Sequence, residues 1–345
     1  MSRILAAISG GVDSASAALK LIEEGHEVEA AILRLHGNAE DSIKEAEKVA
    51  AFLGIPLHVL DERDFFRNTV IKYFVETYEN CMTPNPCIYC NRHCKFPKIL
   101  EFAEANGFDY IATGHYARIE EINGQHCILR GTDPKKDQSY MLYRLSEEQL
   151  SKIIFPLGAL TKEEVRKYAE SKGLTNANAP DSQDICFLPE GDYGSFVEAR
   201  SEKGKTPGEF TDTEGRVMGT HKGLIHYTVG QRKGLGLALP APMYVMAKDR
   251  EQNRVILCSD EELYKHHVAA DKIRLYEDFP DNAEEAIPVT CKIRYSHNEN
   301  AGKAYVKGEQ LFVNFESPVR APAPGQSLVM YEGDRVLGGG IICRS

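Results

Sequence analysis

Hydrophobic and polar positions follow two different patterns along the chain. Up to about residue 200, short apolar runs alternate with segments of helical periodicity. The runs predict strands over Ile4–Ile8, Val28–Leu35, Pro56–Leu60 and Phe108–Thr113, and the periodicity predicts helices over Ser14–Glu24 and Glu40–Phe52. Strands that alternate with helices form parallel βαβ units. We therefore expect an α/β domain with a doubly wound parallel sheet, whose ligands bind at the carboxyl ends of the strands.

Beyond about residue 204 the helical periodicity fades, and short alternating strands with Gly and Pro between them take its place. Ala304–Val306 and Leu311–Phe315 read as a hairpin, and Arg335–Leu337 and Ile341–Cys343 as two further strands. The sequence thus predicts three domains: an α/β domain over 1–203, a small central domain over 204–262 and a C-terminal β-barrel over 263–345.

Composition and charge narrow the function classes. Of the 345 residues, 42% are hydrophobic and 27% charged, which is typical of a globular protein. The chain has no apolar run near the roughly 18 residues of a membrane span, and its first residues lack a secretion signal, so we expect a cytoplasmic protein without a membrane partner. The net charge of −10 argues against a protein that coats nucleic acid. A local basic track would still suffice for RNA, and basic residues do gather at 92–98, 135–136 and 200–233.

A glycine-containing loop lies between the first predicted strand and the first predicted helix, with the sequence Ser9-Gly10-Gly11-Val12-Asp13-Ser14. Glycines let the backbone turn tightly around an anion, and the helix N-terminus adds free N–H donors and a positive dipole end. No lysine follows the glycines, unlike in the common P-loop. The loop predicts a phosphate site, and an ordinary strand-to-helix turn capped by Asp13 or Ser14 is the alternative.

Three of the nine cysteines, Cys87, Cys90 and Cys94, lie close together after the segment Thr83–Pro86. The prolines and asparagines around them predict a rigid loop rather than a helix interior, and the basic residues at 92–98 favour thiolates. A fourth cysteine, Cys186, lies far downstream in another polar segment. An odd count without an export signal makes a disulfide framework a poor explanation.

Three chemistries are open for these thiols. Structural zinc could use Cys87, Cys90, Cys94 and Cys186. A 4Fe–4S cluster could use Cys87, Cys90 and Cys186 and leave one iron open. A catalytic pair of Cys90 and Cys186 needs no metal. Cysteines buried for packing alone are the remaining possibility, which the polar surroundings disfavour.

Six motifs in order resemble the bacterial tRNA-specific 2-thiouridylase family over essentially the full chain. They are the loop at Ser9–Ser14, Asn85-Pro86 with Cys90-Asn91, Thr113–Arg118, Lys136–Tyr140, Asp181–Phe187 and Gly230–Leu235. The resemblance implies a PP-loop domain of the adenine nucleotide alpha-hydrolase type, which splits ATP into AMP and pyrophosphate with Mg²⁺. It also implies the reaction: ATP adenylates the C2 oxygen of the wobble uridine in the anticodon arm of tRNAs for Lys, Glu and Gln, and sulfur then displaces AMP. Activation is needed because a urea-like carbonyl is a poor electrophile.

The resemblance also assigns residues. Cys90 would be the nucleophile and Cys186 the persulfide carrier, supplied by an upstream sulfur donor such as a cysteine desulfurase or a sulfur relay protein. The ATP site would comprise Ala7, Ile8, Ser9, Gly10, Gly11, Val12, Asp13, Ser14, Leu33 and Gly114. The tRNA and its target base would be contacted by Asn85, Pro86, Cys87, His115, Lys136, Asp137, Gln138, Arg294, Tyr295 and Gln326. Solvated surface is the plainer interpretation of an isolated pair such as Arg294-Tyr295.

One departure from the family pattern concerns Cys87, which occupies a position where many members carry Asp. That Asp is assigned acid–base work, for which a cysteine is a weaker candidate. Cys87, Cys90 and Cys186 together look like the three-cysteine set of related tRNA thiolases with a 4Fe–4S cluster, so both sulfur routes stay open. Two other functions compete: an AMP-forming synthetase for a small metabolite, and a zinc-bearing RNA-binding module without turnover.

Overall fold

The computed structural model describes residues 1–37, 39–174, 185–188, 192–239 and 241–344. The chain divides into two compact units. The first consists of Met1–Val70, Cys87–Phe187 and Asp334–Val336, and the second of Ile71–Pro86, Leu188–Gly333 and Leu337–Ser345. The boundaries expected near residues 203 and 262 stay predictions.

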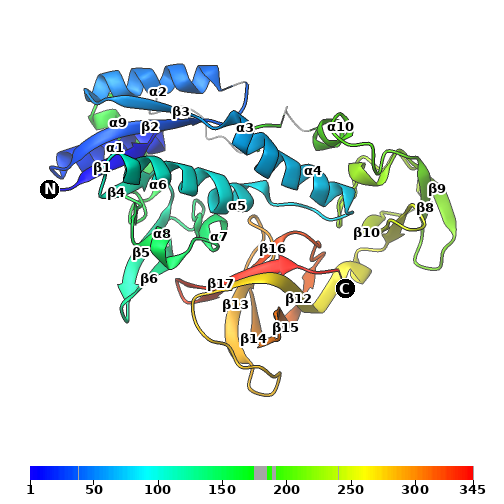
Figure 1. Ribbon diagram of the computed structural model, residues 1–345. Helices are drawn as coiled ribbons and strands as arrows, with labels where there is room; N and C mark the ends of the chain where they lie inside the picture. The colour runs from blue at the N-terminus through cyan, green and yellow to red at the C-terminus, as the bar shows by residue number, and fades with distance from the viewer. Residues whose placement is uncertain (38, 175–184, 189–191, 240, 345) are drawn as a thin grey trace. The chain divides into compact units, whose positions relative to one another are not determined.

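A parallel sheet with strand order β3-β2-β1-β4-β7 lies at the centre of the first unit (Figure 1). Its strands are β1 (Arg3–Ala7), β2 (Glu27–Arg34), β3 (Leu57–Asp61), β4 (Tyr110–Thr113) and β7 (Ile153–Ile154). The predicted doubly wound sheet is confirmed. The strand order reverses between β1 and β4, and this switch point is where open α/β sheets bind ligands. Strand β7 was not predicted, because two residues are too few to give a pattern.

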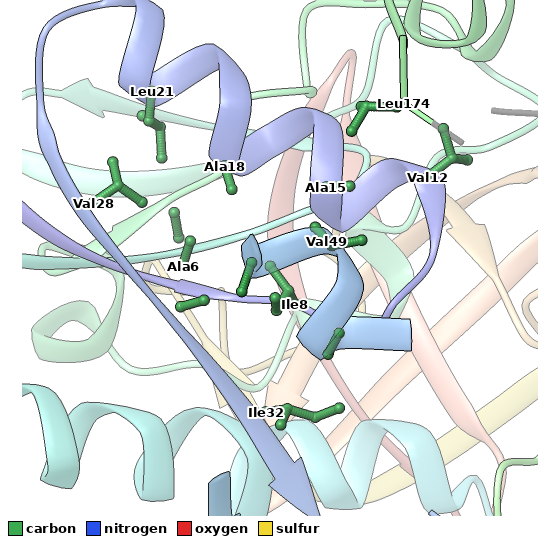
Figure 2. Packing of buried hydrophobic residues seen from close by; sticks show 14 of the residues in the cluster. Ala6, Ile8, Val12, Ala15, Ala18, Leu21, Val28, Ile32, Val49 and Leu174 are labelled. Atoms are coloured by element: carbon green, nitrogen blue, oxygen red, sulfur yellow. The ribbon is translucent and has the colours of Figure 1, made fainter. Parts of the chain in front are cut away.

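Helices α1 (Val12–Glu23) and α2 (Glu40–Leu53) pack on the sheet through one apolar cluster, as predicted from their periodicity. Figure 2 shows Val12, Ala15, Ala18 and Leu21 along one side of α1, facing Ala6 and Ile8 at β1. Small alanines let the first helix approach the strand closely. The remaining elements of this part of the chain are α3 (Arg63–Phe66), η1 (Arg67–Ile71), α5 (Pro86–Cys90), η2 (Asn91–Lys95), α6 (Phe96–Ala105), β5 (Ala117–Ile122), β6 (Gln125–Arg130), α7 (Ser139–Leu142), α8 (Glu147–Leu150) and α9 (Lys162–Ser171).

The second unit combines a small mixed sheet with a barrel. The sheet has the order β10-β11-β8-β9, and the barrel runs β12-β15-β14-β13-β16-β17 and closes by pairing β17 with β12. The predicted C-terminal β-barrel and small middle domain are confirmed. The elements are α4 (Lys72–Glu79), α10 (Tyr193–Glu198), β8 (Gly208–Thr211), β9 (Val217–His221), η3 (Leu224–His226), β10 (Tyr244–Asp249), β11 (Arg254–Cys258), η4 (Glu261–Leu263), β12 (Tyr264–Leu275), β13 (Ile287–Lys292), β14 (Asn300–Lys307), β15 (Gln310–Arg320), β16 (Ser327–Glu332) and β17 (Arg335–Ile342).

The end of the chain differs from the prediction, because the two expected strands are one continuous strand, β17. The glycines at 338–340 lie between the two expected strands. They let the backbone of β12 approach: a Cβ on Gly338 would lie 2.3 Å from the carbonyl oxygen of Arg274. Gly339 pairs with Arg274 and Gly338 with Leu275. A glycine run therefore marks close strand contact here and not a chain reversal.

The cysteine segment also differs from the prediction, because it is helical and not a loop. Cys87 and Cys90 lie on α5, Cys94 lies on the π-helical turn η2, and α6 follows directly. Pro86 is the first residue of α5, where a missing N–H costs nothing. Pro84 precedes α5, and Pro97 lies at the start of α6, directly after the wider π turn. Pro86 and Pro97 are thus compatible with the helices because both occur at helix starts.

Candidate active site

The glycine-rich loop leaves β1 at Ala7 and enters α1 at Val12. Gly10 has a φ of +81°, and a Cβ there would lie 2.6 Å from the Cβ of Glu45 on α2. The backbone N–H of Ser9 donates to Ser14 Oγ at 3.0 Å, and Ser14 Oγ donates to the carbonyl oxygen of Gly11 at 3.0 Å. The loop is thus shaped by its own hydrogen bonds and by a glycine that no other residue could replace without strain. It fits the phosphate cradle that the sequence predicts.

Two further residues of the predicted ATP site lie at the same edge of the sheet. Leu33 is near the carboxyl end of β2 and pairs with Leu60 of β3. Gly114 directly follows β4, and a Cβ on it would lie 2.8 Å from both Asp13 C and Ser14 N. The end of β4 therefore packs backbone against backbone on the first turn of α1. The predicted nucleotide residues converge on the switch point between β1 and β4.

The carboxylate of Asp13, in the first turn of α1, has two partners from distant parts of the chain. Lys162 Nζ lies 2.7 Å from each of its carboxylate oxygens, and Tyr116 Oη donates to Oδ1 at 2.7 Å. Lys162 is buried and is the first residue of α9. Sequence reasoning missed Lys162. The signal was the capping box of Thr161 and Glu164, which marks a helix start at the carboxyl edge of the sheet.

The three clustered thiols differ in exposure. Cys87 is exposed, Cys90 is half-buried and Cys94 is fully buried. Between them, the buried side chain of Asn91 donates through Nδ2 to the carbonyl oxygen of Met141 at 3.0 Å and so anchors the helical segment. Cys94 thus fits the interpretation of a cysteine buried for packing alone, which its polar neighbours in the sequence disfavoured. Cys87 and Cys90, in contrast, reach the surface.

The pKa values of the reactive thiols are raised, which reverses the expectation that nearby basic residues would favour thiolates. The hydrogen bond with the Cys94 thiol, followed by burial, holds the pKa of Cys90 well above its usual range. Cys87 is exposed by surface area, yet desolvation by neighbouring atoms also raises its pKa, with a smaller contribution from Cys90. Cys186 is exposed, yet desolvation by neighbouring atoms, with smaller contributions from Cys90 and Cys87, raises its pKa to about 12. Lys95 lowers all three values, but desolvation outweighs this one cation.

Cys90 and Cys87 act electrostatically on Cys186, although 96 positions of sequence separate Cys186 from Cys90. Residues 180–184 of its motif lie outside the described residues. All nine cysteines are free thiols. Within the described part of the chain, no group of three or more His, Cys, Asp or Glu side chains is arranged to hold a metal ion. The zinc and iron–sulfur ligand sets therefore stay predictions.

Besides Cys87, four residues expected to contact tRNA lie in the first unit, and the side chains of His115, Asp137 and Gln138 make internal contacts. His115 Nδ1 lies 2.7 Å from Thr113 Oγ1, and burial holds the pKa of His115 well below its usual range, so the ring is neutral at pH 7. The buried carboxylate of Asp137 accepts hydrogen bonds from Gly131 and Ser139, and Gln138 Oε1 accepts the N–H of Tyr116 at 2.9 Å. Lys136 is half-buried. Asp137 and Gln138 thus shape the chain beside Tyr116, and their contact with tRNA stays a prediction.

The predicted tRNA residues of the second unit fall into two groups. Gln326 Nε2 donates to the carbonyl oxygens of Thr83 at 3.2 Å and Pro84 at 2.9 Å, and so supports the segment that carries Asn85 and Pro86. Arg294 Nη2 donates to the carbonyl oxygens of Val229 and Ala321 at 2.9 and 3.1 Å. Its neighbour Tyr295 is exposed. Gln326 and Arg294 thus hold backbone in place, which the sequence pattern did not indicate.

The basic track expected at 200–233 is partly neutralised. Lys203 pairs with Glu79 at 3.3 Å, Lys205 with Glu202 at 3.1 Å and Arg216 with Asp212 at 2.5 Å. Three of the basic residues expected to meet RNA phosphates are therefore paired with carboxylates of this chain.

Comparison with known proteins gives matches along nearly the whole chain. Family models match a tRNA methyl transferase HUP domain at residues 2–190, a tRNA methyl transferase PRC-barrel domain at 195–259 and an aminomethyltransferase beta-barrel domain at 265–342. The tRNA-specific 2-thiouridylase MnmA of Acetivibrio thermocellus is 43% identical over 356 residues, covering 99% of both chains. MnmA 1 of Caldanaerobacter subterraneus is 44% identical over 359 residues, covering 99% of this chain and 98% of that protein.

Among solved structures, the U34-tRNA thiolase NcsA from Methanococcus maripaludis with its 4Fe–4S cluster matches with a TM-score of 0.35 and 20% identity. The match covers 53% of this chain and 61% of that one. A score this low carries no conclusion about ligands. Separately, none of the helices in the described ranges is long and apolar enough to cross a membrane.

Proposed function

The chain belongs to the tRNA-specific 2-thiouridylase MnmA family, and from this premise we propose that it converts the wobble uridine of tRNAs for Lys, Glu and Gln into 2-thiouridine. One observation carries the proposal: the first unit contains both the glycine-rich loop at the sheet's switch point and the three thiols Cys87, Cys90 and Cys186. An enzyme that first activates a carbonyl with ATP and then inserts sulfur needs both parts.

The loop of residues 7–14 holds the phosphates of ATP, and Leu33 and Gly114 flank the adenosine. The C2 oxygen of the uridine attacks the α-phosphate, which gives an adenylated base and releases pyrophosphate. Mg²⁺ neutralises the triphosphate when bound. The free N–H groups at the start of α1 stabilise the negative charge that develops on the phosphates.

The sulfur step uses two thiols because the transferred sulfur must gain electrons. The outer sulfur of a persulfide on Cys186 attacks C2 and AMP leaves, which joins the base to Cys186 through two sulfur atoms. Attack of the Cys90 thiol on the Cys186 sulfur breaks that S–S bond. The products are 2-thiouridine and a Cys90–Cys186 disulfide, which a dithiol reductant must open before the next turnover.

A second sulfur route uses a 4Fe–4S cluster on Cys87, Cys90 and Cys186. The observation in its favour is that Cys90 and Cys87 both contribute to the raised pKa of Cys186. The two routes differ in Cys87, which the persulfide route does not use.

The partners follow from the chemistry. The anticodon arm of tRNA supplies the base, and Asn85, Pro86 and Cys87 line it. An upstream sulfur donor such as a cysteine desulfurase or a sulfur relay protein loads Cys186. We place the reaction in the cytoplasm, where tRNA and such donors are found together.

Pyrophosphate release from ATP with and without tRNA tests the proposal. We expect release that depends on tRNA, together with 2-thiouridine in the digested tRNA when a sulfur source is added. A metabolite synthetase would release pyrophosphate without RNA, and an RNA-binding module would release none. Either result would overturn the proposal.

Iron and acid-labile sulfide, measured in protein isolated without oxygen, separate the two sulfur routes. The persulfide route predicts no stoichiometric iron and full thiolation by the Cys87→Ala variant. The cluster route predicts about four iron and four sulfide per chain, both lost in that variant.

A further inference from the structure

A buried lysine next to the nucleotide loop is the most informative feature that the sequence did not reveal. Lys162 Nζ lies 2.7 Å from Oδ1 and 2.7 Å from Oδ2 of Asp13, although 149 positions separate the two residues. The side chain of Lys162 is 8% exposed and that of Asp13 is 30% exposed. The carboxylate is therefore the more exposed member of the pair, and the ammonium is the buried one.

Several contacts fix this pair in place. Tyr116 Oη donates to Asp13 Oδ1 at 2.7 Å, and the backbone N–H of Lys162 donates to Asp133 Oδ2 at 3.0 Å. The start of α9 is held by the Thr161 and Glu164 capping box. Because Lys162 is the first residue of α9, its side chain has little freedom to leave the loop.

The negative charge of Asp13 needs compensation if the loop is to bind a polyphosphate, and Lys162 supplies it. Asp13 places a negative charge in the first turn of α1, beside the N–H groups that should receive a polyphosphate. An uncompensated carboxylate there would repel the nucleotide. The loop has no lysine of its own, so compensation must come from elsewhere in the chain.

We propose that Lys162 is a positioning and charge-compensating residue for the nucleotide loop, which lets the loop accept the β- and γ-phosphates of ATP beside the carboxylate of Asp13. Lys162 thereby preserves the binding of nucleotides with a polyphosphate and matters less for nucleoside monophosphates. The inference rests on the proposed use of ATP and adds a residue to it.

The test compares binding of ATP and AMP by calorimetry, with Mg²⁺ and again in EDTA so that the metal does not mask the charge effect. We expect Lys162→Met to weaken ATP binding by about tenfold to a hundredfold, the scale of one uncompensated charge near a polyphosphate. AMP binding should change by less than about twofold, because AMP lacks the two outer phosphates. The matched control is Lys167→Met, on the same helix, where the lysine is exposed and pairs with Glu163.

The double variant Asp13→Asn/Lys162→Met separates charge compensation from simple packing. With both charges removed, ATP binding in EDTA should recover relative to Lys162→Met. Asp13→Asn alone leaves the lysine uncompensated, and should bind ATP in EDTA at least as tightly as the natural protein. The comparison of Asp13→Asn with the natural protein tests the inference even if Lys162→Met fails to fold.

Three results would overturn the inference: equal losses of ATP and AMP binding in Lys162→Met, unchanged ATP binding in that variant, or weaker ATP binding in EDTA by Asp13→Asn. Failure of the proposed function looks different, because pyrophosphate release by the natural protein would then be absent or independent of tRNA, whatever the variants do to ATP binding.

Discussion

The nucleotide loop and the thiol segment belong to the same compact unit but are prepared for chemistry to different degrees. The loop is already shaped: Ser9 and Ser14 bond within it, Gly10 fits against α2, and Lys162 holds Asp13. The thiols are instead in an unreactive state, since burial and the Cys90–Cys94 hydrogen bond raise their pKa values.

This difference suits the proposed order of the two half-reactions. A preformed loop can bind ATP at once, whereas a protonated thiol resists oxidation and off-path attack. In the proposed reaction the base is adenylated before sulfur is needed, so the thiols gain from staying protonated until then. The comparison yields three predictions, in order of decreasing effect.

The largest expected effect comes from removing the proposed sulfur chemistry while leaving the loop intact. Cys90→Ser and Cys186→Ser should each lower 2-thiouridine formation by about a thousandfold or more, because a hydroxyl can neither carry a persulfide nor open one. Pyrophosphate release dependent on tRNA should remain within about threefold of the natural protein. Both are measured on one reaction mixture, by nucleoside mass spectrometry and a pyrophosphate assay. Retained thiolation in either variant would remove that cysteine from the mechanism.

The reverse experiment disturbs the loop and leaves the thiols alone. In Gly114→Ala the new Cβ would lie 2.8 Å from the backbone of Asp13 and Ser14, which cannot move aside as a flexible side chain could. We expect a loss of about tenfold to a hundredfold in ATP-dependent pyrophosphate release, the scale of a small misplacement at a catalytic site.

Gly37→Ala is the matched control for this substitution, because a Cβ there has no neighbour within 4 Å. The rate at which iodoacetamide modifies Cys186 should be the same in both variants. Normal pyrophosphate release by Gly114→Ala would show that β4 does not shape the nucleotide site.

The smallest effect concerns the protonation state of Cys186. Its raised pKa of about 12 means that the thiol form dominates throughout the neutral range, and that the reactive thiolate fraction grows with pH. The rate of alkylation of Cys186 by iodoacetamide should therefore rise about tenfold per pH unit between pH 7 and 9. Mass spectrometry of the modified peptide measures the rate. A free cysteine begins to level off near pH 8.5, and the same plateau for Cys186 would contradict the raised pKa.

Much of this protein could be predicted from its sequence. The alternation of apolar runs and helical periodicity determined the parallel sheet, with the predicted strands within about two residues of β1 to β4. The position of Ser9–Ser14 directly after the first strand determined the phosphate loop, because glycine conformation and helix starts are local properties of the chain. The hairpin of β14 and β15 was equally local.

Other features depended on atoms that are far apart in the sequence. The cysteine segment is helical because Asn91 donates to the carbonyl oxygen of Met141, and because Pro86 and Pro97 occur at helix starts. The glycines of β17 face β12 and form no turn. Desolvation and, for Cys90, the hydrogen bond with Cys94 outweigh the nearby basic residues in setting the pKa values of the thiols. Local pattern thus determined which elements form and where the phosphate loop lies. Only the tertiary structure brought Lys162 to Asp13, because charge pairing and desolvation depend on distance in space and not on spacing along the chain.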